Sequence, residues 1–125
     1  MNESDLKYRT KQFGLRIMKL VDALPNTTSG RAIGNQLIRS GTSVGANYRA
    51  ACRGRSKPEF IAKLGIVIEE ADECGYWLEL IMESNLLPEN QVLPLHKEAD
   101  ELTAIFIASV RTTKSKIKNH NSKIK

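Results

Sequence analysis

Long apolar runs are missing from this chain of 125 residues. The longest stretches without a charged residue have nine residues, as in Leu102–Val110, whereas a helix that crosses a bilayer needs roughly 20. The first residues, Met1–Asp5, include acids and no apolar segment, unlike a signal peptide. Because neither a membrane span nor a secretion signal is recognisable, the sequence predicts a cytoplasmic protein with no membrane contact.

Patterns that carry catalytic chemistry are also scarce. His96 and His120 stand alone, without Cys or His at metal-ligand spacing, and we expect both to be solvated. The segment Gly30–Gly34 lacks the Gly-Lys-Ser/Thr ending of a phosphate-binding loop. The acids between Glu69 and Glu73 lack the Glu-x-x-His pairs of di-metal bundles. We therefore expect no catalytic residue, metal or cofactor, and predict that the protein is not an enzyme.

Cysteine is rare, since the chain has only Cys52 and Cys74. Both fall on helix faces that we expect to be buried, and a reducing cytoplasm disfavours a disulfide. We expect two reduced thiols that pack as small apolar side chains.

Acids are absent from one stretch that is otherwise strongly charged. Residues 25–57 contain six basic residues and no acid, whereas residues 58–87 contain seven acids. At about 100° per residue, four of the arginines share one polar arc of a helix. This Arg stripe consists of Arg31, Arg39, Arg49 and Arg53.

The Arg stripe has three interpretations. A solvated face is the weakest, because six charges without one acid are unusual for it. The stripe can instead pair with the acidic segment that follows, within the fold or across a subunit interface, or it can bind phosphates; the sequence favours neither of these two. No aromatic residue is interleaved with the arginines, so binding would be mainly to the nucleic-acid backbone and weakly sequence-specific.

Small residues occupy the opposite face of the same segment. Gly34, Gly41, Gly45 and Cys52 would form a shallow groove that lets another helix come close. Each interior glycine costs roughly 1 kcal/mol of helix propensity, so only packing could hold this helix together. We predict a buried central helix; the alternative is a break near Ser40–Ser43.

Apolar residues recur at helical spacing along the rest of the chain and predict four helices without a strand. The first covers about Leu6–Leu24 and stops at Pro25. The second follows the turn at residues 26–29 and ends at Gly54, which we expect to be a left-handed cap.

The third helix is predicted over about Lys57–Ser84. Ser56 and Glu59 fit a reciprocal capping box at its start, and Asn85 and Pro88 end it. The main part of the fourth helix is expected from about residue 94, after a kink or short turn. Residues from 114 onward are polar and are expected to fray.

Connections between these long helices are short, which forces consecutive helices to lie antiparallel. The predicted fold is all-α, an antiparallel up-down-up-down four-helix bundle over residues 1–113. A basic, frayed C-terminal tail is predicted over residues 114–125.

The third helix also has a second patch, roughly opposite its core stripe. It contains Ile66, Glu69, Glu73, Trp77 and Leu80. A fourth helix could cover these apolar groups, or they could form a subunit interface, where Trp is over-represented.

Three sequence runs resemble a known family. They are Gln36–Asn47 (Gln-Leu-Ile-Arg-Ser-Gly-Thr-Ser-Val-Gly-Ala-Asn), Arg53–Phe60 (Arg-Gly-Arg-Ser-Lys-Pro-Glu-Phe) and Glu69–Glu79 (Glu-Glu-Ala-Asp-Glu-Cys-Gly-Tyr-Trp-Leu-Glu). They are similar to the four-helix-bundle proteins of 23S rRNA intervening sequences, also labelled S23 ribosomal proteins. The similarity extends from about Tyr8 to Thr113, with Ala50 where many relatives carry Glu.

Relatives in that family include the accessory proteins of diversity-generating retroelements, which are basic pentameric rings that contact nucleic acid and a reverse transcriptase. The resemblance therefore implies a homo-oligomer, expected to be a pentamer. It also implies RNA or DNA, and a protein such as a reverse transcriptase, as partners. It makes a subunit interface the favoured interpretation of the patch around Trp77.

Two hypotheses follow from the sequence. The first is a non-enzymatic oligomer that binds RNA or DNA, and the second is a protein-interaction scaffold whose charges serve self-assembly and partner docking. For the first, the predicted nucleic-acid-binding residues are Arg31, Arg39, Arg49, Arg53, Arg55, Lys57, Lys114, Lys116 and Lys118.

Overall fold

Four helices build the protein. The computed structural model describes residues 1–124, with side chains as far as residue 122; residue 125 of the predicted tail lies outside the described residues. The helices are α1 (Glu3–Asp22), α2 (Thr28–Cys52), α3 (Lys57–Glu83) and α4 (Glu89–Ile124).

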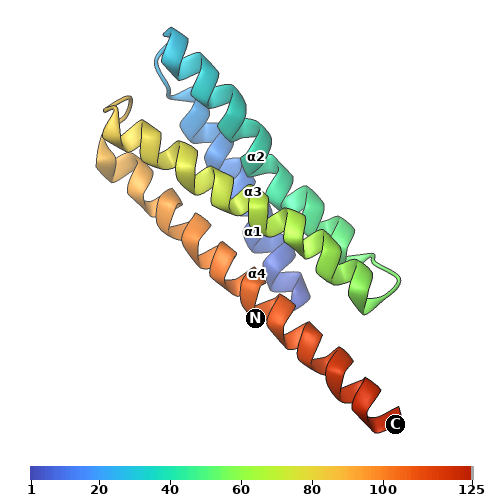
Figure 1. Ribbon diagram of the computed structural model, residues 1–125. Coiled ribbons are helices and arrows are strands. Elements are labelled where there is room, and N and C mark those ends of the chain that lie inside the picture. Colours follow the sequence, from blue (N-terminus) through green and yellow to red (C-terminus); the bar gives the residue numbers. More distant parts are fainter. Residues whose placement is uncertain (125) are drawn as a thin grey trace.

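Consecutive helices run antiparallel and pack side by side (Figure 1). α2 lies between α1 and α3, α3 lies between α2 and α4, and α1 meets α4 over a shorter stretch. No strand occurs in residues 1–124. The predicted all-α, up-down-up-down four-helix bundle is confirmed.

Side-chain caps begin the first three helices. Asn2 and Asp5 form a reciprocal capping box at α1, and Thr27 Oγ1 accepts the Gly30 N–H at 3.0 Å at α2. At α3, Ser56 Oγ accepts the Glu59 N–H at 3.2 Å, as predicted. The second half of that box differs, because Glu59 Oε2 accepts from the Arg55 backbone N–H at 3.2 Å rather than from Ser56.

The left-handed residue of the bundle is Asn85, not Gly54. Asn85 follows α3 with φ of 59°, whereas none of the described glycines has a positive φ. The prediction of a left-handed cap at Gly54 was therefore wrong. A Cβ at Gly54 would lie 3.0 Å from the Ala51 carbonyl oxygen, so lack of room, not backbone conformation, explains this glycine.

Asn85 provides a test of the α3–α4 turn. Replacing Asn85 by alanine should lower the free energy of unfolding by about 1 kcal/mol, because a Cβ-bearing residue without a local polar side chain disfavours this conformation. Asn85→Gly should be neutral or slightly stabilising. Urea denaturation of both variants checks the difference, and equal midpoints would contradict it.

α4 departs from the prediction at both ends. It begins at Glu89 and contains Pro94, rather than starting near residue 94. Val92 and Leu95 are buried on either side of Pro94, so packing holds a turn in which proline removes one backbone hydrogen bond. The segment from residue 114, expected to fray, is helical as far as Ile124.

α2 is unbroken through the segment where a break was the alternative. Hydroxyls there bond to carbonyls of the preceding turn: Ser40 Oγ to Gln36 O at 3.0 Å, and Ser43 Oγ to Arg39 O at 2.6 Å. These polar groups are satisfied within the helix. The predicted central helix is confirmed.

The small residues of α2 face α1, as a close helix contact requires. A Cβ at Gly41 would lie 2.7 Å from Ile17 Cγ2, and one at Gly45 would lie 3.3 Å from the Thr10 carbonyl oxygen. The core that surrounds this contact is continuous through all four helices. Its largest fully buried apolar side chains include Phe13, Ile17, Leu37, Leu64, Leu78, Ile81, Leu102 and Phe106.

Candidate nucleic-acid interface at the basic end of the bundle

The structure divides the predicted Arg stripe. Arg31 and Arg53 are 22 residues apart on one helix, a rise of roughly 33 Å, so they lie at opposite ends of the bundle. Arg31 donates to Asn26 Oδ1 at 2.8 Å. The stripe is therefore too long to be a single local site.

Arg39, in the middle of α2, pairs with α3 of the same chain. Its Nη2 lies 2.7 Å from Glu73 Oε2, and its Nη1 lies 3.7 Å from Glu70 Oε2. Burial raises the pKa of Glu70, and the positive charge of Arg39 opposes that rise. For Arg39, the structure therefore supports pairing with the acidic helix rather than an unpaired cation, and its partners lie in the same chain.

The predicted basic residues of the α2–α3 connection lie together at one end of the bundle. Arg53 is the C-cap of α2, Arg55 lies in the turn, and Lys57 is the first residue of α3. The bond from the Arg55 N–H to Glu59 holds this turn against the start of α3. All three basic side chains are exposed.

α4 brings a further cation to the same place. A hollow of about 530 Å³ is lined by Arg55 and Lys57 together with Lys116 of α4 and Glu3 of α1. Figure 1 shows the C-terminal part of α4 leaving the bundle at the end where α2 turns into α3. Residues of all four helices and of the α2–α3 turn thus converge, although they are distant in sequence.

The three predicted lysines of α4 do not share one face. Lys114 and Lys118 are four residues apart and lie on the same side of the helix, whereas Lys116 is about 200° from Lys114. Lys116 alone of the three lines the hollow. The other two are exposed on the projecting part of α4.

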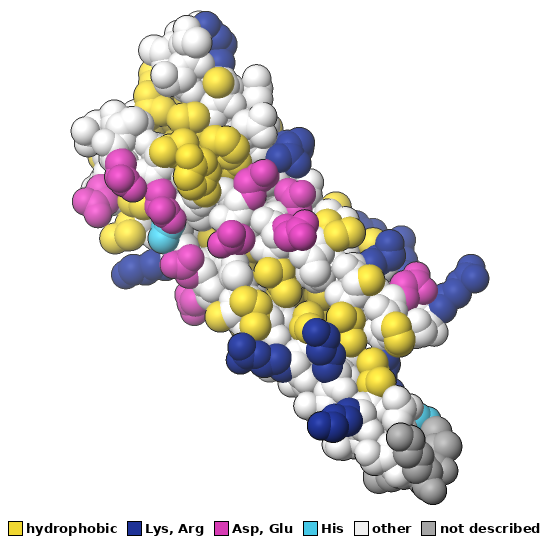
Figure 2. Space-filling model, viewed as in Figure 1, with side chains coloured by type: hydrophobic (Ala, Val, Ile, Leu, Met, Phe, Trp, Pro, Cys, Tyr) yellow, Lys and Arg dark blue, Asp and Glu magenta, His cyan; other side chains and the backbone are white. Residues whose placement is uncertain are grey.

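Charge is unbalanced at this end. Glu3 is engaged by Lys7, with Oε1 and Nζ 3.0 Å apart, and this contact lowers the pKa of Glu3. In the described part of the chain, no carboxylate lies within 4.0 Å of the side-chain nitrogens of Arg53, Arg55 or Lys57; Glu59 reaches only the Arg55 backbone N–H. On the face in Figure 2, acids gather around the middle, and Lys and Arg dominate toward the projecting end of α4.

The basic end is defined here as Arg53, Arg55, Lys57 and Lys116. Its guanidinium and ammonium groups are exposed donors that can contact several phosphates of a chain at once.

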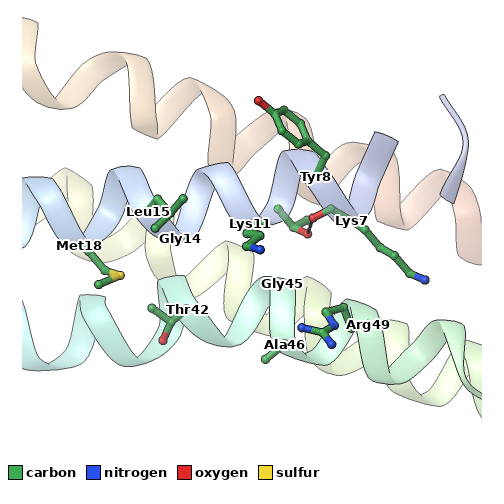
Figure 3. A pocket seen from close by; sticks show the side chains of 11 residues that line it. Lys7, Tyr8, Lys11, Gly14, Leu15, Met18, Thr42, Gly45, Ala46 and Arg49 are labelled. Atoms are coloured by element: carbon green, nitrogen blue, oxygen red, sulfur yellow. Dashed lines mark hydrogen bonds between the residues drawn. The ribbon is translucent and has the colours of Figure 1, made fainter. Parts of the chain in front are cut away.

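A second basic surface escaped the sequence prediction. An open groove of about 600 Å³ lies between α1 and α2 (Figure 3), with Arg49 on its α2 side. Two α1 cations, Lys7 and Lys11, line it together with apolar side chains of α1. Lys11 and three exposed apolar residues of α1 (Tyr8, Leu15 and Met18) are spaced by three or four residues. That spacing was readable in the sequence as a second helical stripe.

The predicted interface patch on α3 is only partly exposed. Ile66 is 43% exposed and Glu69 is exposed, but Glu73 pairs with Arg39. Trp77 and Leu80 are half-buried, and Trp77 packs against the core. The large exposed group on this face that sequence reasoning missed is Tyr76, which is 54% exposed and stacks edge-on against Trp77.

The side chains of His96, Cys52 and Cys74 have structural contacts in the bundle. His96 Nε2 lies 2.9 Å from Glu79 Oε2. Cys74 is buried, donates to Ser40 Oγ at 3.4 Å, and burial raises its pKa to about 12; Cys52 is half-buried. Within the described residues, no group of three or more His, Cys, Asp or Glu side chains could hold a metal ion. Nor is any helix there both long and apolar enough to span a membrane.

Comparisons with known proteins match most of the chain. Residues 2–108 match the family model described as 23S rRNA-intervening sequence protein. A crystal structure of a protein with unknown function from the S23 ribosomal protein family of Bacteroides thetaiotaomicron VPI-5482 is similar, with a TM-score of 0.79 and 33% identity. That match covers 84% of this chain and 97% of the other. No curated protein matches the chain.

Proposed function

Because the chain belongs to the family of 23S rRNA-intervening sequence proteins, we propose that it is a non-enzymatic homo-oligomer that binds the phosphates of RNA or DNA through its basic end. The observation that carries this proposal is the convergence of Arg53, Arg55, Lys57 and Lys116. Among the described residues, the side chains of Arg53, Arg55 and Lys57 form no ion pair with a carboxylate.

Relative to the sequence prediction, the proposed surface is smaller and better defined. Arg31 lies at the far end and Arg39 is engaged by Glu73, so neither belongs to it. Lys114 and Lys118 would extend the surface along the projecting part of α4. Aromatic side chains are absent from the wall of the hollow except for Phe60, which is half-buried. Contact with the phosphate backbone is therefore favoured over base stacking.

The scaffold hypothesis remains as a second candidate, favoured by the exposed acidic and apolar side chains of α3. Ile66 and Tyr76 are large groups in contact with solvent, as at surfaces that bind proteins. The family resemblance suggests five copies for the oligomer and a protein partner such as a reverse transcriptase.

Titration of labelled structured RNA and duplex DNA at several salt concentrations tests the proposed function. Each phosphate neutralised on duplex DNA contributes about 0.9 to the slope of log affinity against log salt. Arg53→Glu, Arg55→Glu and Lys57→Glu together should weaken binding at least tenfold at low salt and reduce that slope by roughly 3.

The matched control reverses three exposed cations elsewhere: Arg16, Arg31 and Lys97. Both triple variants change the net charge by the same amount. If the site lies at the basic end, the control variant should bind nucleic acid more tightly than the variant reversed at Arg53, Arg55 and Lys57. Absence of wild-type binding at low salt would exclude nucleic-acid binding. Equal losses in both variants would show a diffuse charge effect and contradict the assigned surface.

A further inference from the structure

The groove between α1 and α2 combines apolar exposure with uncompensated charge. Tyr8 is 67% exposed, Leu15 48% and Met18 43%. In the described chain, neither Lys11 nor Arg49 has a carboxylate within 4.0 Å, whereas Lys7 is paired with Glu3. Figure 3 shows Leu15 and Met18 on α1 and Thr42 and Ala46 on α2, along the same opening.

The outer surface of α3 has the opposite charge and a similar apolar content. Ile66, Glu69, Asp72 and Tyr76 follow one another at intervals of three or four residues, and all four are exposed. We call them the α3 ridge. Among the described residues, no basic group lies within 4.0 Å of Glu69 or Asp72.

The two surfaces also match in length. Ile66 and Tyr76 are ten residues apart, as are Tyr8 and Met18, and each pair spans about 15 Å of helix. On the ridge, Glu69 and Asp72 lie between Ile66 and Tyr76. In the groove, Lys11 and Arg49 lie toward the Tyr8 end, and Leu15 and Met18 lie toward the other end (Figure 3). From this complementarity we infer that the α3 ridge of one copy docks in the α1–α2 groove of the next copy.

Each copy can make this contact twice. The ridge points outward from α3, while the groove lies between α1 and α2, and the two surfaces share no residue. One copy can therefore accept a ridge in its groove and offer its own ridge to another neighbour. Such a head-to-tail contact closes into a ring if the rotation permits, and otherwise continues as a chain.

This inference deepens the homo-oligomer part of the proposed function and rests on it, but it is independent of nucleic-acid binding. The basic end shares no residue with either surface. Ion pairs between Lys11 or Arg49 and Glu69 or Asp72 would be removed from bulk water by the apolar groups around them. They would fix the register of the helices.

Charge reversal tests the inference on the full-length chain. By light scattering at micromolar concentration, the wild type should have a mass that is a multiple of 14.0 kDa. Lys11→Glu with Arg49→Glu places acids opposite the acidic ridge, and Glu69→Lys with Asp72→Lys places bases opposite the basic groove. Each pair should weaken self-association at least tenfold, with helicity by circular dichroism unchanged.

Combining all four substitutions restores opposite charges across the contact. This exchanged variant should regain the wild-type mass, an outcome that a folding defect could not produce. The control variant, Arg16→Glu with Lys97→Glu, reverses two charges outside both surfaces. It should retain the wild-type mass.

The outcomes separate the inference from the proposed function. A monomeric wild type would overturn both the inference and the proposed oligomer. An oligomer that survives both reversed pairs would overturn only the inference, as would an exchanged variant that is folded but monomeric. The titration of RNA and DNA decides the nucleic-acid proposal separately.

Discussion

Replacing Gly41 by alanine is expected to lower the free energy of unfolding by about 1–3 kcal/mol, although alanine has roughly 1 kcal/mol more helix propensity than glycine. The added Cβ would lie 2.7 Å from Cγ2 and 2.9 Å from Cγ1 of Ile17. Ile17 is fully buried, and its branched side chain is restricted at χ1. Ile17 therefore has little freedom to move aside, and α1 must shift. Gly41→Leu should cost still more.

Gly65 provides the matched control for Gly41. It also lies inside a long helix, but a Cβ there would meet no heavy atom within 4 Å. Gly65→Ala should therefore raise the free energy of unfolding by up to about 1 kcal/mol. Chemical denaturation measures both changes. If both variants gain stability, the close contact between α1 and α2 does not limit this fold.

The bundle could be predicted because its signals are local. Apolar spacing, prolines and capping residues determine where helices begin and end, and short connections determine that neighbours are antiparallel. The spacing of Gly34, Gly41 and Gly45 also indicated a close helix contact correctly. The periodicity did not determine which helix packs on this glycine face of α2, because any of the other three helices could have done so.

The errors in the fold come from choices that local sequence does not decide. Gly54 and Asn85 each follow a helix, and both residue types tolerate a left-handed backbone. Glycine is the more frequent left-handed cap, yet here Asn85 has a positive φ and Gly54 does not. Pro94 suggested that the main part of the fourth helix starts near residue 94. The helix starts at Glu89 instead, because the packing of Val92 and Leu95 outweighs one missing backbone hydrogen bond.

The candidate site was less predictable because it depends on the register between helices. The sequence placed Arg39 and Arg49 in one stripe, but only the packing of α2 against α3 brings Glu73 within 2.7 Å of Arg39. Lys116 is far from Arg55 in sequence and lines the same hollow only because α4 passes the α2–α3 turn. Periodicity identifies a charged face, whereas the tertiary contacts decide which of its charges remain unpaired.

Near the basic end, Phe106 anchors helix α4 through a contact with an aromatic ring of α2. Phe106 is fully buried, and its ring centroid lies 5.1 Å from that of Tyr48 on α2. Beyond it, no described residue of α4 belongs to the buried core; Val110 only packs partly against that core. Phe106 is thus the last strong anchor before the segment that carries Lys116.

Phe106→Ala should lower the free energy of unfolding by about 3–5 kcal/mol and loosen the end of α4 selectively. Amide exchange should accelerate in residues 107–122 beyond what the global loss explains, since the lost contact is the one that holds this segment. Leu78→Ala is the control: Leu78 is equally buried but lies nearer the other end of α3. Its cost should be about 2–5 kcal/mol, without a selective effect on α4. If both variants accelerate exchange in 107–122 equally, the segment does not depend on the Phe106–Tyr48 contact. If Phe106→Ala alone also weakens nucleic-acid binding under conditions where the protein stays folded, the placement of Lys116 contributes to the basic end.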